Sequence, residues 1–547
     1  MYIEPNTVIK VLRNIPWNNT YEDTVMFASQ SAQLAYMNTM VKYTFQDQTY
    51  NRVNKGVSRV KMKAENLYDC NYMMFQNSNF GTKWFFAFIN KVEYINNEVS
   101  EIYFEIDEVQ TWLFDFEILR CFVEREHSVT DEIGENLLPE PVALGQYVME
   151  SIQSEVDKDI AKIVRPDTVL LYTSFDGGGA PAEGRIVNHH VYSGMEIMFF
   201  QVLDLDGHVD IQHVQQLNAI LESFVGNNLM EGVANIVMCP HVLAPDPETP
   251  ATYSETIQMQ NHTHASHLGG NYVPKNNKLY TYPYSYLYIT TGNGNGVQYK
   301  YEHFATDAKK FTLRGSISGS EPQIALFPKD YTEGSEYDNL LILSNYPTVA
   351  FAYDTFKAYL AQNKYRIAGQ IVSAGVSGVS GAFITGLSSM TKTGDINPVA
   401  EAIGATHVTV GALNKVISLG AEMATASIQP PQTKGQHPAD TLWAENNLLN
   451  FYFYDATIDE EHAKVIDDFF SRFGYATNRL KVPNRDSRPY WNYVKTGGCI
   501  IQGNVPADSI RKLCDIHDKG ITYWRSGSVV GHYELDNRPN NGGTSNE

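Results

Sequence analysis

The sequence has few cysteines for its length, and none of them are paired in a motif. Five cysteines occur among 547 residues, and no CxxC pair is present. Structural zinc sites and disulfide frameworks need closely spaced or paired cysteines, so the sequence favours neither. The cysteines are Cys70, Cys121, Cys239, Cys499 and Cys514. We therefore expect the fold to depend on a hydrophobic core, for which an apolar content of 43% is sufficient.

Charge is also scarce, and positive charge most of all. Charged residues make up 19% of the chain, and 41 Lys and Arg against 62 Asp and Glu give a net charge of −21. Such a surface repels nucleic acid, which disfavours a protein that reads a DNA sequence. Repulsion would still suit a channel that passes DNA without retaining it. The 34 tyrosines and the low charge are typical of β-rich proteins whose faces meet other subunits.

One long stretch, from Ile367 to Gln429, has little charge and almost no aromatic residues. Ile367–Thr391 contains no Asp, Glu, Lys or Arg, and Phe383 is the only aromatic residue between Tyr365 and Trp443. The break at residues 392–395 leads into a second Gly/Ala-rich apolar run. The composition here differs sharply from that of the rest of the chain.

Three interpretations of this stretch remain open: a membrane-active hairpin, an unusual packed loop and a disordered segment. A flexible linker would be more polar, and five glycines in 25 residues disfavour a buried helix in water. As a helix, 25 residues would span about 37 Å, enough to cross a hydrocarbon core of about 30 Å. Small residues four apart also allow helices to approach closely in lipid. The residues that we expect to be membrane-active are Ile367, Ile371, Val372, Ala374, Gly378, Ala382, Phe383, Ile384, Gly386 and Leu387.

No signal-peptide pattern opens the chain, because its first residues lack a charged start followed by an apolar run. We therefore expect a protein made in the cytoplasm and not exported by the usual route. Few proteins made in the cytoplasm carry a latent membrane segment. Toxins and proteins of virus particles are two classes that do.

Hydrophobic patterning predicts an α+β fold, predominantly β, with several domains and a long Gly/Ala-rich hydrophobic insert. The expected divisions are a β-rich domain at 1–141, a mixed middle domain at 142–335, a helical lead-in at 336–366, the hydrophobic loop at 367–431, an α+β domain at 432–536 and a disordered tail at 537–547.

Short alternating runs and turn residues predict the individual elements. Strands are expected at 57–64, 71–75, 83–89, 101–106, 117–124, 168–175, 196–203, 234–239, 282–290, 490–494, 499–502 and 521–524. Helices are expected at 107–114, 210–226, 339–364, 506–518 and from a capping box at Thr457 and Glu460 to Gly474. Residues 292–296 should form the tip of a hairpin.

No group of residues makes a convincing active site. His262, His264 and His267 resemble metal ligands, but no nearby Cys or carboxylate completes the set, so a polar loop is favoured. Residues 204–210 lack the spacing of a calcium loop, and the Gly-rich segments lack a phosphate-binding Lys-Ser/Thr pair. Glu124 and Glu126, beside His127, would share one face of a strand as an exposed rim or a subunit contact. We therefore expect no enzymatic activity, no cofactor and no metal.

Two long blocks resemble one family of phage proteins. MFQNSNFGTKWFFAFI (74–89) continues through FEIDEVQTW (104–112) to FVEREH (122–127), and FGYATNRLKVPNRDSRPYWNYVKT (473–496) is followed by GITYW (520–524). Both blocks resemble the tail-knob, or distal tail-tube, proteins of short-tailed phages of the Picovirinae/Salasmaviridae type. RGSIS (314–318) and the insert closed by IQPPQTK (428–434) lie between them in matching order.

The resemblance implies a homo-hexameric tube at the distal tail of the virion, with the N- and C-terminal segments packed together as its wall. Its hydrophobic loops would plug the lumen, leave it on infection and penetrate the host cytoplasmic membrane, so that phage DNA can pass. The implied partners are other tail proteins, namely the proximal tail or collar and the appendages. Glu401, Lys415 and Glu422 interrupt the second half of the insert, which leaves the number of spanning segments open. The alternative function is a receptor-binding knob that recognises the host cell wall without membrane activity.

Overall fold

The computed structural model of the chain describes residues 6–48, 56–78, 81–152, 155–182, 185–187, 190–192, 194–204, 208–227, 229, 232–243, 253–259, 266–291, 295–306, 309–318, 321–335, 337–344, 346, 351–352, 433–434 and 449–539. The chain forms two compact units. Unit 1 contains Met1–Tyr147, Ser266–Tyr284 and Ile458–Glu547, and unit 2 contains Val148–Ala265 and Ser285–Thr457. Strands outnumber helices in the described residues, which confirms the predicted α+β, predominantly β class.

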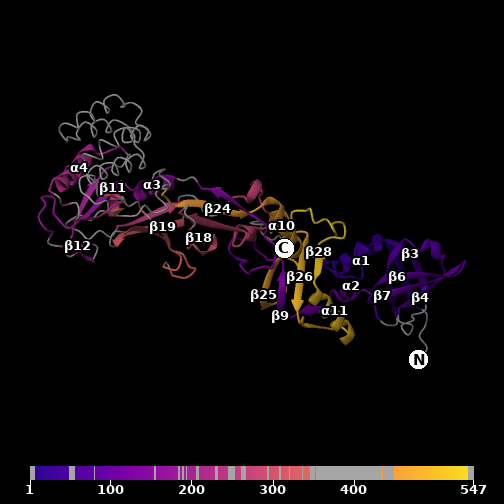
Figure 1. Cartoon of the computed structure of the whole chain (residues 1–547). Helices are drawn as coiled ribbons and strands as arrows, with labels where there is room; N and C mark the ends of the chain where they lie inside the picture. Colours follow the sequence, from indigo (N-terminus) through magenta and orange to yellow (C-terminus); the bar gives the residue numbers. More distant parts are fainter. Residues whose placement is uncertain are drawn as a thin grey trace, which may run out of the picture. The chain divides into compact units, whose positions relative to one another are not determined.

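The N-terminal part of unit 1 forms an antiparallel sheet with the strand order β3-β1-β5-β6-β7-β4. Figure 1 labels four of these strands, β3, β4, β6 and β7. In that order the strands span Val41–Gln48, Thr7–Arg13, Cys70–Asn77, Phe85–Asn96, Val99–Ile106 and Val57–Val60. Both faces of β5 are buried: Tyr72 and Met74 pack in one cluster, while Met73 and Phe75 pack in another. A strand buried on both faces reads as a continuous apolar run, which explains the sequence YMMF.

Two helices accompany this sheet, α1 (Gln30–Thr39) and α2 (Glu108–Trp112). Asp107 begins α2 by accepting a hydrogen bond from the Gln110 N–H at 3.0 Å. Its carboxylate also accepts from the Tyr72 hydroxyl at 2.8 Å and from Trp17 Nε1 at 3.2 Å. Burial nevertheless raises the pKa of Asp107 to about 6, because desolvation outweighs these hydrogen bonds.

A second sheet of unit 1 joins strands from the two ends of the sequence, in the order β2-β28-β26-β9-β25. These strands span Asp23–Val25, Ile521–Trp524, Trp491–Gly497, Cys121–Glu126 and Tyr475–Lys481. The β2–β28 pair is parallel and the other pairs are antiparallel. Trp491 and Trp524 are register partners and are fully buried, with ring centroids 5.1 Å apart. The sheet thus ties residues 23–25 to residues 521–524.

Two amphipathic helices complete the C-terminal part of unit 1, α10 (Glu460–Phe473) and α11 (Ala507–Lys519). The helix α10 buries Ala463, Ile466 and Phe470, and α11 buries Leu513 and Ile516. The helix α11 packs beside a two-stranded ladder of β8 (Phe116–Ile118) and β27 (Ile501–Gly503). Short 3-10 helices in unit 1 are η1 (Ala64–Asn66), η5 (Gly269–Asn271) and η6 (Asn277–Tyr280).

In the part of unit 2 that the structure describes, there are three larger sheets and two helices. Their strand orders are β10-β24-β17-β18, β16-β19-β20-β21 and β14-β11-β15. The strands span Tyr147–Ser151, Tyr452–Ile458, Ser285–Thr290 and Gly296–Tyr299; Tyr253–Met259, Lys309–Ser318, Glu321–Lys329 and Leu341–Leu343; and Glu196–Gln201, Thr168–Thr173 and Val233–Cys239. The helices are α3 (Glu155–Val164) and α4 (Ile211–Gly226), with η4 (His241–Leu243) and η7 (Tyr301–His303).

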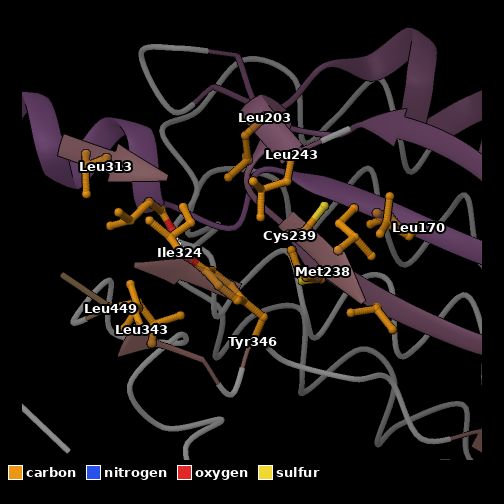
Figure 2. Packing of buried hydrophobic residues seen from close by; sticks show 14 of the residues in the cluster. Leu170, Leu203, Met238, Cys239, Leu243, Leu313, Ile324, Leu343, Tyr346 and Leu449 are labelled. Atoms are coloured by element: carbon orange, nitrogen blue, oxygen red, sulfur yellow. Dashed lines mark hydrogen bonds between the residues drawn. The ribbon is translucent and has the colours of Figure 1, made fainter. Parts of the chain in front are cut away.

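Residues from these sheets share one hydrophobic core. Figure 2 shows Leu170 of β11, Met238 of β15 and Ile324 of β20 together with Tyr346. The Tyr346 hydroxyl, buried in this core, donates a hydrogen bond to the Val164 carbonyl at 3.1 Å. The core therefore unites strands that are far apart in the sequence.

Two small strand pairs lie apart from the larger sheets. The first joins β12 (Arg185–Val187) to β13 (His190–Tyr192). The second joins β22 (Phe351–Ala352) to β23 (Thr433–Lys434), with Ala352 opposite Thr433 and Phe351 opposite Lys434. The chain therefore enters and leaves residues 353–432 at one place.

Some predicted elements differ from the observed ones. The strand expected at 117–124 is two strands, β8 and β9, which belong to different sheets. The prediction of a helix at 339–364 is wrong at Leu341–Leu343. This short apolar run forms strand β21, which pairs with β20. Apart from β22, residues 347–364 lie outside the described residues. The cap of α10 is Asp459, because β24 continues through Thr457 and places that residue in a ladder opposite Ser285.

Candidate functional site

The ten residues predicted to be membrane-active, from Ile367 to Leu387, lie outside the described residues, as do Glu401, Lys415 and Glu422. Within the part of the chain that the structure describes, no helix is long and apolar enough to cross a membrane. The membrane interpretation therefore stays a prediction.

The candidate metal ligands do not converge in the described part of the chain. His262 and His264 lie outside it, and His267 Nδ1 is 3.0 Å from the Ser266 hydroxyl. Among the described residues, no group of three His, Cys, Asp or Glu side chains could hold a metal ion. Asp204 accepts from the His208 N–H at 2.8 Å and Asp210 accepts from the His213 N–H at 3.2 Å, so both carboxylates stabilise local backbone.

Glu124 and Glu126 do not share an exposed face, and the prediction for Glu126 is wrong. Glu124 pairs with Lys495 at 2.7 Å near the surface. Glu126 is 1% exposed, pairs with Lys481 and accepts from the Asn484 N–H at 2.8 Å. Register irregularities on both sides of β9 shift the alternation between residues 123 and 125, which turns Glu126 inward.

His127 is a buried packing residue rather than an acid–base group. Its Nδ1 accepts from the Tyr493 N–H at 2.8 Å, so its Nε2 carries the proton and donates to the Ser471 carbonyl at 3.1 Å. Burial and the nearby Arg488 lower the pKa of His127 to about 3. At neutral pH the imidazole is therefore uncharged, and both its nitrogens are engaged.

A buried ionic cluster lies close to His127 in the sequence. The Glu140 carboxylate is inaccessible to solvent and pairs with Arg125 and, at 2.7 Å, with Lys278. It also accepts from the Ala476 N–H at 2.9 Å, while Arg125 donates to the Gly474 carbonyl at 2.6 Å. The cluster thus links β9, η6 and the start of β25. Buried charges of this kind are tolerated because each has partners, and removing one partner is costly.

Two further carboxylates hold residues 272–277, which precede and open η6. Asp467 of α10 accepts from the Tyr272 hydroxyl and the Lys275 N–H at 2.7 Å, and from the Asn276 N–H at 3.0 Å. Asp131 accepts from the Asn277 N–H at 3.1 Å and from the Tyr475 hydroxyl at 2.6 Å. We call Asp131, Glu140, Asp467 and the groups that they bind the carboxylate clasp. It fixes Ser266–Tyr284 to the rest of unit 1, and sequence reasoning missed it.

Unit 1 also has a cavity of about 770 Å³ between the six-stranded sheet, α2 and α11. Phe75, Phe85, Phe104 and Trp112 line it, with Phe75 and Phe85 stacked at 5.4 Å. At its rim, Glu108 pairs with Lys512 at 3.0 Å and accepts from Trp112 Nε1 at 3.1 Å. The rim charges are engaged with each other, so the arrangement favours a packing role over acid–base chemistry.

The comparisons agree with a structural protein. The family model for the C-terminal domain of tail knob protein gp9 of Bacillus phage phi29 matches residues 249–538, more than half of the chain. The family model for the N-terminus of caudoviral major tail proteins matches residues 5–117, which contain the six-stranded sheet.

Individual relatives match nearly the whole chain. Tail knob proteins gp9 of Bacillus phages PZA and phi29 are each 26% identical to it, over 97% of this chain and 98% of their own. The solved structure of the bacteriophage C1 tail knob protein gp12 matches with a TM-score of 0.54 at 13% identity, covering 95% of this chain and 97% of that one. That likeness shows a shared fold. The chain belongs to the family of phage tail knob proteins and is a structural component of the distal tail of the virion.

Proposed function

We propose that six copies of this chain form a tube through which the phage genome leaves, and that the stretch 367–429 penetrates the host cytoplasmic membrane during ejection. The observation that carries this proposal is the combination of a major-tail-protein match at residues 5–117 with one long apolar stretch, whose first 25 residues carry no charge. A tail tube alone does not need such a stretch. In this proposal the protein has no catalytic activity.

The β22–β23 pair supports a loop that leaves the body of the protein and returns to it. Residues 351–352 and 433–434 are antiparallel partners, so the chain is held together on either side of residues 353–432, which include the apolar stretch. In the tube, six such loops would plug the lumen before ejection. At the membrane, burial of Ile371, Val372, Phe383 and their neighbours in lipid would favour the released state.

The net charge supports passage of DNA without retention. A subunit charge of −21 offers few cationic contacts to phosphates, and each such contact would hold the strand in place. We propose that DNA crosses the lumen without sequence-specific binding. The remaining partners would be other tail proteins, namely the proximal tail or collar and the appendages.

The second candidate is a receptor-binding knob without membrane activity. Neither family model covers residues 118–248, most of which belong to unit 2. A part of the chain outside the family models is a reasonable place for recognition of one particular cell wall. Purified protein should then decorate host cells in a manner that free wall fragments inhibit.

Dye release from liposomes tests the membrane step. Intact protein should release dye across some part of a pH scan, and a variant lacking 367–429 should not, while both sediment as hexamers. Release by the deletion variant would assign the activity to another segment. If the hexamer released no dye under any condition, the membrane step would be excluded. The remaining functions would be a passive tube or a receptor-binding knob.

A further inference from the structure

Three of the five thiols meet at one place in unit 1. Cys121 begins β9, Cys499 precedes β27 and Cys514 lies on α11, and all three belong to the hydrophobic cluster formed around α11. Cys121 and Cys499 are buried, whereas Cys514 is partly exposed. Cys70 and Cys239 are buried in other clusters. The three thiols therefore form a local group that neither the fold comparison nor the proposed conduit explains.

The backbone fixes this thiol cluster. Ile501 pairs with Ile118, and the Leu119 N–H donates to the Ile500 carbonyl at 2.8 Å, which holds the start of β9 beside residues 499–501. Cys121 and Cys514 pack in the same hydrophobic cluster as Ile501. Burial first, and then the neighbouring Cys514 and Cys121 thiols, raise the pKa of Cys499, so both of the other thiols lie near it. Cys499 is thus the central member.

We propose that Cys514 and Cys499 form a redox-sensitive latch, reduced in the cytoplasm and closed as a disulfide once the virion is outside the cell. Cysteine thiols stay reduced in the cytoplasm and meet oxidants in the extracellular environment. The latch would connect α11 covalently to the segment before β27. Because α11 forms one wall of the aromatic cavity, closure would also fix that wall.

A small-molecule disulfide can supply the oxidation, and the steps balance. The Cys514 thiolate attacks one sulfur of glutathione disulfide, forming a mixed disulfide and releasing one glutathione thiolate. The Cys499 thiolate then attacks the Cys514 sulfur and releases the second glutathione. Two protein thiols lose two electrons and two protons, and one glutathione disulfide becomes two glutathione thiols. Cys514 is the entry thiol because it is the only member of the cluster that is partly exposed.

The rate of closure should depend strongly on pH. Burial raises the pKa of both Cys499 and Cys514, so few thiolates are present at pH 7. Below those pKa values each thiolate fraction rises about tenfold per pH unit, and closure should accelerate by about that factor or more. A cluster that only packs would show no such dependence.

The test is to treat the folded full-length protein with glutathione disulfide, count free thiols and map the cross-linked peptides by mass spectrometry. Free thiols should fall from five to three, with Cys499 joined to Cys514 and with Cys70 and Cys239 unmodified. Cys121→Ala should leave the reaction intact. Cys499→Ala should stop it at a stable glutathione adduct on Cys514, a result independent of any loss of stability.

Two outcomes would overturn the proposal. One is a stable glutathione adduct on Cys514 of the wild-type protein while Cys499 remains free. The other is a folded protein whose five thiols resist the reagent even at pH 9. Circular dichroism of each variant confirms that the compared proteins are folded.

Discussion

Buried histidines in unit 1 are held uncharged by their hydrogen bonds and their surroundings. His517 donates from Nδ1 to the Leu513 carbonyl at 2.6 Å and accepts at Nε2 from the Tyr523 hydroxyl at 2.7 Å. Burial lowers the pKa of His517 to about 4, and His127 behaves in the same way. These residues therefore make unit 1 sensitive to acid without any catalytic role.

Replacing His517 with Gln should flatten the pH dependence of stability. Between about pH 6.5 and 4 the unfolded chain binds a proton at His517 and the folded chain does not, so stability is lost as the pH falls. The wild type should lose up to about 1.4 kcal/mol per pH unit that the variant does not lose. Urea unfolding followed by tryptophan fluorescence measures this, because five of the six tryptophans belong to unit 1.

The exposed His532 provides the matched control for that substitution. Its side chain pairs with Glu534 at the surface, at 2.7 Å. His532→Gln should still lose stability as the pH falls from about 6.5 to 4, because this variant keeps the buried His517. Equal profiles for wild type and His517→Gln would contradict the assignment of a lowered pKa to His517.

In unit 2, Asp167 should control the protonation of His241. The buried Asp167 carboxylate lies 2.6 Å from His241 Nδ1 and accepts from the His241 N–H at 2.5 Å, which raises the pKa of His241. A raised pKa gives stability that is complete below the unfolded pKa of about 6.5 and is lost as the pH rises through the folded value. Asp167→Asn should lower the His241 pKa in an NMR titration.

The stability of the Asp167→Asn variant gives a second readout. Its deficit relative to the wild type should be larger at pH 5.5 than at pH 9, and of the order of 1–3 kcal/mol at the acidic end. Glu196→Gln, at a partly exposed position of β14 in the same three-stranded sheet, supplies a control that leaves Asp167 and His241 in place. A deficit that does not vary with pH would exclude the ion pair as its source.

At the scale of elements, the sequence predicted those helices and turns whose conformation depends on residues close to them in the chain. The helices α4 and α11 lie within a residue or so of their expected bounds, because apolar spacing and a terminal glycine mark them. The hairpin around 292–296 is confirmed by the pairing of Thr290 with Gly296. The bounds of these elements could be predicted because the turn residues and apolar spacing that determine them lie within the element or next to it.

Elements fixed by distant partners were less predictable. Nothing near Glu126 or Glu140 shows that their carboxylates are buried, because Lys481, Arg125 and Lys278 come from three separate stretches. Glu140 lies one residue before the expected division at residue 141, and its sequence neighbours give no sign that it anchors the ionic cluster. Likewise, Thr457 and Glu460 match a capping box, but strand pairing with Ser285 decides the conformation of Thr457.

The carboxylate clasp should depend on Asp467. Replacing it with Ala leaves the N–H groups of Lys275 and Asn276 and the Tyr272 hydroxyl without their acceptor in a buried site. We expect unit 1 to lose about 3 kcal/mol or more, since each uncompensated buried group costs about 1–3 kcal/mol. Denaturant unfolding and faster hydrogen exchange at residues 272–278 would show this.

Asp468 is the matched control for that variant. It lies next to Asp467 on α10 but is exposed. Asp468→Asn should leave both stability and exchange at residues 272–278 close to wild type. If Asp467→Ala weakened α10 but left exchange at 272–278 unchanged, the clasp would not be what holds this segment.

At the scale of the whole molecule, each unit is assembled from separated stretches of sequence. Removing the residues after Gly520 deletes β28, including Ile521, Tyr523 and Trp524, which are at most 1% exposed. Loss of one large buried side chain costs about 3–5 kcal/mol, so losing the strand should exceed the usual stability of a domain. Unit 2 contains none of these residues.

Hydrogen exchange would separate the two units in that truncated chain. Protection should disappear from β9 and β26 of unit 1 and persist in β11 and β15 of unit 2. Persistent protection in β26 would mean that the five-stranded sheet is stable without β28. Simultaneous loss in both units would mean that they unfold together.

The parallel pairing of residues 23–25 with residues 522–524 has a consequence for biosynthesis. Unit 2 can be complete once Thr457 has left the ribosome, whereas β2 must wait for a partner made about 500 residues later. At roughly 5–20 residues per second that delay is about 25–100 s. Nascent copies on neighbouring ribosomes would meanwhile expose unfinished sheets to one another. The five-stranded sheet of unit 1 can therefore be completed only when synthesis of the chain is nearly finished.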